Sequence, residues 1–272
     1  MTRLSAGDKR IKFANPPINE VAIALFHLPL GELKAQHIGL YWNRIRNRYP
    51  RCDQQTVIIS PQDQQPPEIF KDVPGEIFPL PRFWFFSDVH PTLIQIQRNA
   101  FLFNWRRGDG KVEYPHYETV ADGFWKELDR YNTFLQDVIG EKLDVIQRCE
   151  LNYVNLIDPN EFFAGPSEIG NVLPLFGGLH QVETEDQRLV GMNTTVTYQI
   201  NRMLFIDLIT RLGVRSDTKQ PVIYLEMKAH GVPDDLSLEG GRSWYDAAHN
   251  AIYRMFLEIT DKQIQEEVWE PR

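Results

Sequence analysis

The segment 93–106, which reads LIQIQRNAFLFNWR, limits the possible folds of this chain more than any other stretch. Apolar and polar side chains alternate along it, a pattern typical of strands with one buried face. A tight reversal at Arg98–Asn99 would pair its two arms as a β-hairpin. One face of this hairpin would carry Ile94, Ile96, Phe101, Phe103 and Trp105, and the other Gln95, Gln97, Asn104 and Arg106. We therefore expect antiparallel strands with one apolar and one polar face.

The periodicity of the remaining sequence predicts further strands and two long helices. Apolar residues recur at helical spacing across 117–139 and again from Ser243, where Asp246 would complete a capping box. We predict strands at 20–26, 56–60, 82–88, 145–157, 191–201, 203–214 and 222–229, and a helix within 31–49. Six prolines across 61–81 predict a surface loop. Each half of the chain thus reads strand, helix, several strands and long helix.

This repeated order predicts an α+β fold made of two similar halves, residues 1–140 and 141–272. The halves would meet near residues 140–144 and form one continuous antiparallel sheet, with the long helices on one face. This order of elements is similar to the TATA-binding-protein-like architecture, as an analogy of topology alone. A sheet of this kind has two open edges, which would allow a homodimer.

The charge of the chain is unevenly distributed. It has 29 Lys and Arg against 37 Asp and Glu, a formal net charge of −8. Residues 1–140 hold 17 basic and 16 acidic side chains, whereas residues 141–272 hold 12 and 21. Binding to phosphates needs clustered positive charge, so we do not expect nucleic acid as a partner. The alternative, a nucleic-acid-binding protein, would rest on the arginines of 44–51 and on Arg106–Arg107.

Several features of the sequence bear on where the protein is located. No stretch approaches the roughly 18 consecutive apolar residues of a membrane span, so we expect no membrane association. The basic residues near the N-terminus have no apolar region behind them, as a secretory signal would. Cys52 and Cys149 lie far apart in the sequence and cannot form a metal cage between them. A reduced, cytoplasmic setting is therefore predicted.

No motif predicts a catalytic or metal site, so we expect no cofactor and assign no catalytic residue. The histidines and cysteines lack the spacings of zinc sites, and the glycine pairs lack those of nucleotide-binding loops. Asp246 and His249, three residues apart on a predicted helix, could form an acid–base pair. With Glu150 they would define an enzyme of dispersed carboxylate and histidine residues. The alternative is that Asp246 caps the helix and His249 packs beside it.

Polar side chains at strand positions predict a face that binds a ligand or partner. The candidates are Gln95, Gln97, Asn104 and Arg106 of the hairpin, with Glu150 and Asn152 of the strand 145–157. In that strand Asn155 would point to the opposite face. Long amides and a guanidinium suit hydrogen bonding to a peptide or polar ligand better than bond breaking. We therefore predict a non-enzymatic binding or regulatory protein, with a solvated face that binds nothing as the alternative.

Several phrases of the sequence resemble those of one known family. They are NPPINEV (15–21), HIGLYW (37–42), PRFWFFS (81–87), FLFNWR (101–106), YPHYE (114–118), CELNYVN (149–155) and AHNAIYRMFLEIT (248–260). The chain resembles a sporadically distributed, uncharacterised family of prokaryotic proteins of about 250 residues. The resemblance implies an accessory protein of a mobile-element or defence locus, with a protein partner encoded nearby. It implies no catalytic residues.

Overall fold

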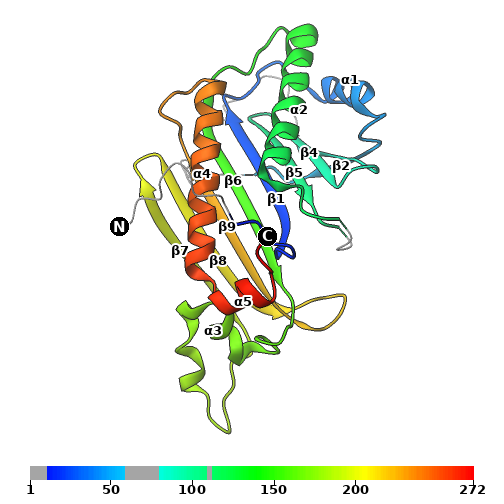
Figure 1. Ribbon diagram of the computed structural model, residues 1–272. Helices are drawn as coiled ribbons and strands as arrows, with labels where there is room; N and C mark the ends of the chain where they lie inside the picture. The colour runs from blue at the N-terminus through cyan, green and yellow to red at the C-terminus, as the bar shows by residue number, and fades with distance from the viewer. Residues whose placement is uncertain (1–10, 59–79, 109–111) are drawn as a thin grey trace.

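A computed structural model describes residues 11–58, 80–108 and 112–272. In this part of the chain, nine strands form one sheet in the order β2-β3-β4-β5-β1-β6-β9-β8-β7 (Figure 1). All neighbouring strands run antiparallel. The predicted α+β fold with one continuous antiparallel sheet is confirmed.

The first half of the chain forms one side of this sheet. Its elements are β1 (Ile18–His27), α1 (Ala35–Ile45), β2 (Arg51–Gln55), β3 (Arg82–Phe86), β4 (Thr92–Gln97), β5 (Ala100–Arg106) and α2 (His116–Ile139). The hairpin prediction is confirmed, since β4 and β5 pair with Ile94 opposite Phe103 and with Arg98–Asn99 at the turn. The strand predicted at 56–60 is wrong for its described residues, because the charged segment 51–55 pairs with β3 instead. The loop predicted at 61–81 falls mostly outside the described residues.

The second half forms the other side. Its elements are β6 (Ile146–Ile157), short helical turns between 166 and 182 that include α3 (Ile169–Val172), β7 (Met192–Asn201), β8 (Leu204–Val214), β9 (Pro221–Gly231), α4 (Leu238–Ile259) and α5 (Lys262–Glu267). Pairing of β1 with β6 joins the two halves at the middle of the sheet. None of the described helices is both long enough and apolar enough to cross a membrane.

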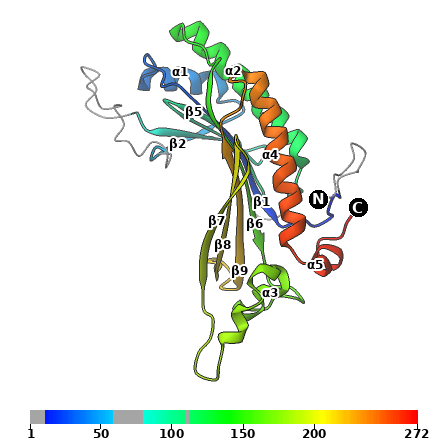
Figure 2. The same ribbon diagram turned by 90° about the vertical axis from the view of Figure 1, so that its left-hand side faces the viewer.

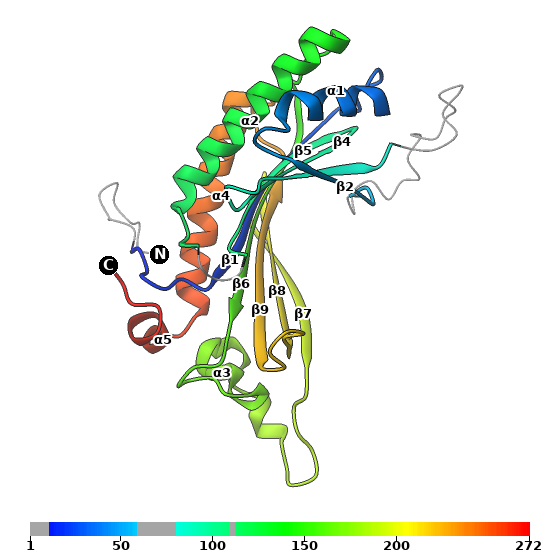
Figure 3. The same cartoon turned by 90° about the vertical axis from the view of Figure 1, so that its right-hand side faces the viewer.

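The helices α1, α2 and α4 all lie on one side of the sheet (Figures 2 and 3). The α2 helix packs on β1 and β5, and α4 packs on β6 and β9. Between the helices and the sheet lies the core, whose largest fully buried side chains include Phe101, Phe124, Tyr131 and Tyr245. Burial of these aromatic rings supplies much of the favourable free energy of folding. We call the opposite side, which carries Ala22, Asn104 and Asn152 on its central strands, the helix-free face.

The start of α4 differs from the prediction. Ser237, and not Ser243, is the N-cap, and its Oγ accepts a hydrogen bond from the Gly240 amide at 3.1 Å. Asp235 in turn accepts hydrogen bonds from the Ser237 amide and hydroxyl. Ser243 and Asp246 therefore lie inside the helix, so the expectation that Asp246 caps it is wrong.

Candidate functional site

The six residues predicted to bind a ligand or partner lie on the helix-free face. In the β1–β5 and β1–β6 pairings, Ala22 stands opposite both Asn104 and Asn152. On β1, Ala24 stands opposite Glu150 of β6, and Glu20 stands opposite Arg106 of β5. Residues directly opposite each other in a ladder share a face. The β4 partners Gln95 and Gln97 are on this face too, opposite Leu102 and Ala100. Asn155 points to the core side, as predicted.

Four of the six predicted binding residues are buried, contrary to the expectation of a wet face: Glu150, described below, and three amide side chains. Gln95, Gln97 and Asn104 are 4%, 2% and 3% exposed. Arg82 Nη1 donates to Gln95 Oε1 at 2.8 Å, and Gln95 Nε2 donates to Asn104 Oδ1 at 2.7 Å. Asn104 Nδ2 then donates to Glu20 Oε1 at 2.6 Å. The Gln95 and Asn104 amides therefore hydrogen-bond to each other and to Arg82 and Glu20, as is usual for buried polar groups.

Gln97 binds the backbone of Ile58, in the segment that covers this part of the helix-free face. Its Oε1 accepts from the Ile58 amide at 2.9 Å, and its Nε2 donates to the Ile58 carbonyl at 3.2 Å and to Asn99 Oδ1 at 2.6 Å. The Ile58 side chain then packs on a small apolar cluster of Ala24, Phe26, Ala100 and Leu102. Alternation in the sequence shows that a face is polar, but it cannot show that another segment lies over it.

A charged cluster occupies the β6 part of the helix-free face. The Arg148 guanidinium pairs with Glu150, and both side chains are almost fully buried. Lys228 Nζ lies 3.1 Å from Glu150 Oε1, and Arg148 stacks 4.6 Å above the Phe26 ring centroid. Burial is the main cause that lowers the pKa of Lys228. The sequence analysis missed Arg148, although it precedes Glu150 by two residues and therefore shares its face.

The outer part of this face, over β9 and β8, is more accessible. Asn152 Nδ2 donates to Glu226 Oε1 at 2.7 Å, and the Tyr224 hydroxyl donates to Glu226 Oε2 at 2.6 Å. Next to them His230 Nε2 lies 3.3 Å from Asp207 Oδ2, and burial is the main cause that lowers the His230 pKa. These side chains are half-buried. The face thus changes from buried amides at β4 to accessible charged groups at β8.

Asp246 and His249 lie on the other side of the sheet, on α4. The Tyr117 hydroxyl donates to Asp246 Oδ1 at 3.0 Å, and the Tyr117 ring stacks on His249 with centroids 4.1 Å apart. His249 Nδ1 lies 2.9 Å from the Tyr153 hydroxyl. The two predicted residues therefore share a site through Tyr117, which the sequence analysis missed. Glu150 is separated from them by the sheet, so the dispersed enzyme site is not brought together.

The predicted basic residues are largely engaged within the chain. Arg44 pairs with Asp137, Arg48 with Glu127, Arg51 with Asp88 and Arg106 with Glu20, and Arg107 donates to the Pro16 carbonyl. Exposed pairs such as Arg44–Asp137 contribute little to stability, but all of these contacts reduce the positive charge offered to a phosphate.

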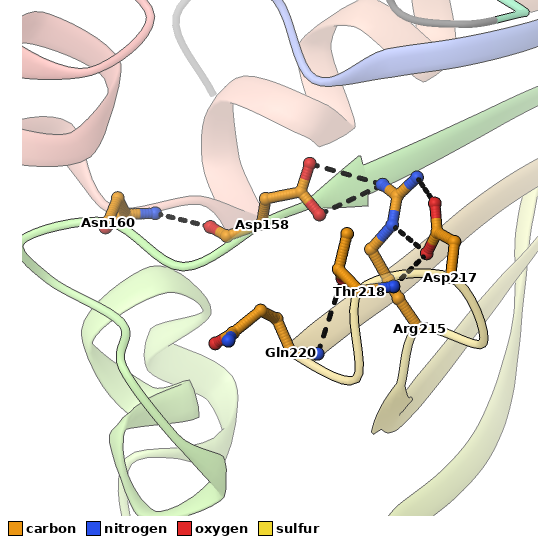
Figure 4. A network of polar contacts seen from close by, with 6 residues as sticks. All are labelled: Asp158, Asn160, Arg215, Asp217, Thr218 and Gln220. Atoms are coloured by element: carbon orange, nitrogen blue, oxygen red, sulfur yellow. Dashed lines mark hydrogen bonds and ion pairs between the residues drawn. The ribbon is translucent and has the colours of Figure 1, made fainter.

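A closed polar network ties the β8–β9 turn to the end of β6 (Figure 4). Arg215 contacts both carboxylate oxygens of Asp158, at 3.1 and 3.3 Å, and both of Asp217, at 3.1 Å each. Hydrogen bonding to Arg215 lowers the pKa of Asp217 to about 2. The groups satisfy one another, so we assign this network to holding the turn.

The cysteines do not form a metal or redox site. Both are free thiols, and burial raises the pKa of Cys149 to about 12 and also raises that of Cys52. Both therefore remain thiols near neutral pH, whereas the thiolate is the nucleophile and metal ligand. In the described ranges, no group of three His, Cys, Asp or Glu side chains could hold a metal ion.

The open edges of the sheet differ sharply. The β2 edge is five residues long and contains Arg51 and Asp53. The β7 edge is ten residues long, MNTTVTYQIN, with no charged residue and no proline. Val196, Tyr198 and Ile200 on β7 are 38%, 37% and 38% exposed. We regard this edge as the strongest candidate for a contact with another chain.

No protein-family model matches the chain, and no curated protein matches it. The resemblance to a sporadic prokaryotic family therefore stays a prediction, as do the partner encoded nearby and the cytoplasmic location.

Proposed function

We propose that this chain is a non-catalytic binding protein that joins another chain by adding a strand to β7, and that the added strand is β7 of a second copy. The observation that carries the proposal is the long, uncharged edge at β7, on which no other strand of the described residues pairs. The polar face predicted to bind a partner then adjoins the interface through its accessible outer part.

The unprotected backbone of β7 supports strand addition. An edge strand presents a row of unpaired N–H and C=O groups, which proteins usually protect with charged residues, proline, or short strands. The β2 edge has such protection in its length and in Arg51 and Asp53, whereas β7 has none of it. A strand that lacks these devices over ten residues is suited to pair with another strand.

The side chains of β7 support the same contact. Val196 and Tyr198 share the helix side of the sheet because their β8 partners Leu208 and Ile206 are in the core, and Ile200 lies at an irregularity of the ladder beside Asn201, which stands opposite Leu204. The α4 helix packs over β6 and β9 and leaves β7 outside its cover (Figure 1). An exposed apolar row beside open hydrogen-bonding groups gains favourable burial when a second strand is added.

The uncharged side chains and the register of β7 are compatible with a second copy as the partner. At a net charge of −8, two copies repel each other, but β7 brings no charged side chain to the contact. Antiparallel pairing about a twofold axis at Thr197 would set Val196 opposite Tyr198 of the second copy. Aromatic and β-branched residues form favourable cross-strand pairs. The contact would be isologous, the commonest arrangement in homo-oligomers.

The mass of the protein in solution tests this proposal. We expect sedimentation equilibrium of the purified full chain to give a dimer, and hydrogen exchange to be slow along 192–201. Thr197→Lys should give a monomer with fast exchange in β7. Gln54→Lys, which adds the same charge to the exposed β2 edge, should remain dimeric.

Two outcomes would overturn the second-copy proposal. One is a monomer of the unmodified protein at all concentrations, and the other is a dimer that Thr197→Lys leaves intact. Protection of β7 only in a complex with a different protein would assign the edge to that protein instead.

We make a second proposal, about the topology of the two halves. We infer that the two halves share one TATA-binding-protein-like topology. The support is that β1 and β6, the first strand of each half, are neighbours at the centre of the sheet, and that each half ends its run of strands with a long helix. The described strands number five in the first half and four in the second, so the match is partial.

A further inference from the structure

We propose that a cavity at the junction of the two halves, between α2, α4 and β6, binds a small neutral aromatic molecule with one hydroxyl group, of the size of a single-ring phenol. The inference is independent of the contact proposed at β7. It rests on the size of the cavity, the chemistry of its walls and the strained backbone at its rim.

The size of the cavity suits one ring. Its volume is about 120 Å³, and its walls include Phe13, Met227, Ile252 and Phe256. A dry cavity of roughly 150 Å³ with apolar walls can hold benzene. The cavity opens to solvent on the side of Ile11 and Lys12, so a ring could enter and make dispersion contacts with the apolar walls.

Three of the polar side chains that line the cavity, Tyr114, Tyr153 and His249, contact one another. The Tyr153 hydroxyl from β6 lies 2.9 Å from His249 Nδ1 on α4 and 3.2 Å from the Tyr114 hydroxyl. Burial raises the pKa of Tyr153 far above its usual value, so its hydroxyl keeps its proton at neutral pH. A few polar groups in an otherwise apolar pocket are what orient a small ligand.

The His249 imidazole is positioned by a contact with α2. Tyr117 stacks on the His249 ring and directs its own hydroxyl to Asp246. These contacts connect α2 to α4, so the polar end of the cavity is built from both halves of the chain. A site whose side chains are held by their neighbours binds with little loss of rotamer entropy.

The rim of the cavity carries a strained residue. His116, the first residue of α2, has φ of 68°, in the left-handed region that a non-glycine residue seldom adopts. His116 also lines the cavity, as do Lys12 and Glu118. Strained backbone is concentrated at ligand sites, where the surrounding structure maintains it.

The wall chemistry selects a neutral ligand. Burying a carboxylate against these apolar side chains would be costly without a buried cation. At the rim, Lys12 and Glu118 have opposite charges, so they give no net attraction for an anion, and Lys12 is exposed rather than buried. A hydroxyl, by contrast, can both donate and accept a hydrogen bond at the Tyr153–His249 end.

Binding of p-cresol, toluene and benzoate to the full-length protein tests the inference. We expect saturable chemical-shift changes with p-cresol for residues of α4 and β6, weaker binding of toluene and no binding of benzoate. Tyr153→Phe removes the polar contact and keeps the shape, so it should weaken p-cresol binding about tenfold and leave toluene binding unchanged. Tyr41→Phe, which removes a buried hydroxyl outside the cavity, should bind both as the unmodified protein does.

Ile252→Phe provides a second test, because it fills the cavity. This variant should lose binding of both p-cresol and toluene while its circular dichroism stays native. The inference is overturned if p-cresol gives no shifts at millimolar concentration, or if Ile252→Phe still binds it. Equal affinity for p-cresol and toluene, or an unchanged Tyr153→Phe variant, would overturn the role of the polar end.

Discussion

Asn104 on β5 and Glu20 on β1 are joined by a hydrogen bond of 2.6 Å on the helix-free face, where the Asn104 amide donates to the carboxylate. Asn104 also accepts from Gln95 at 2.7 Å, so it is the central member of a buried chain of polar groups. The residue has the surroundings of a structural hydrogen-bonding group. Its participation in partner binding stays a prediction.

Replacement of Asn104 by Ala should therefore destabilise the protein. The change leaves the Gln95 amide and the Glu20 carboxylate without this partner, which costs about 2 kcal/mol when the groups are buried. Urea denaturation followed by circular dichroism measures the loss. Gln54→Ala, at an exposed position of β2, should cost less than about 0.5 kcal/mol. A similar, small loss for both variants would show that Asn104 is solvated.

Close packing of α2 on β5 gives a coupled pair of substitutions. A Cβ at Gly123 would lie 2.9 Å from the Phe103 ring, so Gly123→Ala should destabilise the protein despite the higher helix propensity of Ala. Phe103→Ala should cost about 3–5 kcal/mol through lost burial. In the Phe103→Ala background, Gly123→Ala should become stabilising because it enters the space left by the ring. A double-mutant cycle measures this coupling, and additive effects would contradict it.

His27 should make stability depend on pH. Its Nδ1 donates to the Leu28 carbonyl, and its buried Nε2 has no hydrogen-bond partner among the described residues. Burial lowers the pKa of His27 from 6.5 to about 4. Between these values the unfolded chain binds a proton that the folded chain does not, so stability falls as pH falls from 6.5 to 4, by about 3 kcal/mol in total.

A matched variant isolates the His27 contribution. In His27→Gln the part of the acid-induced loss that arises from this site should disappear, while the loss from other groups remains. Urea denaturation of both proteins at several pH values between 7 and 4 gives the difference. Parallel curves for the two proteins would mean that His27 titrates normally in the folded state.

The cap of α4 can be tested by comparing two serines. Ser237→Ala removes the acceptor of the Gly240 amide and should cost about 1 kcal/mol. Ser243→Ala, at an exposed position inside the helix, should change stability by less than about 0.5 kcal/mol. Thermal unfolding of the two variants distinguishes the observed start of the helix from the one predicted from the sequence, for which the larger loss would fall on Ser243.

Local patterns were sufficient to predict most of the elements. The alternation in 93–106 determined the hairpin and the residues on each of its faces, as the pairing of Ile94 with Phe103 confirms. The helical spacing in 117–139 likewise predicted α2 to within one residue. These predictions succeed because the periods of strands and helices depend only on residues close together in the chain.

Contacts between distant residues decided what the sequence alone could not. Glu20 and Asn104 are 84 positions apart, and Tyr117 and Asp246 are 129 positions apart. The first contact joins two polar residues on a part of the face that is buried. The second is made by the carboxylate of Asp246, which was expected to cap a helix. The sequence by itself determined which side chains share a face, because that follows from backbone geometry. Only the tertiary structure determined which of those faces are covered and which groups meet, because burial depends on the path of the whole chain.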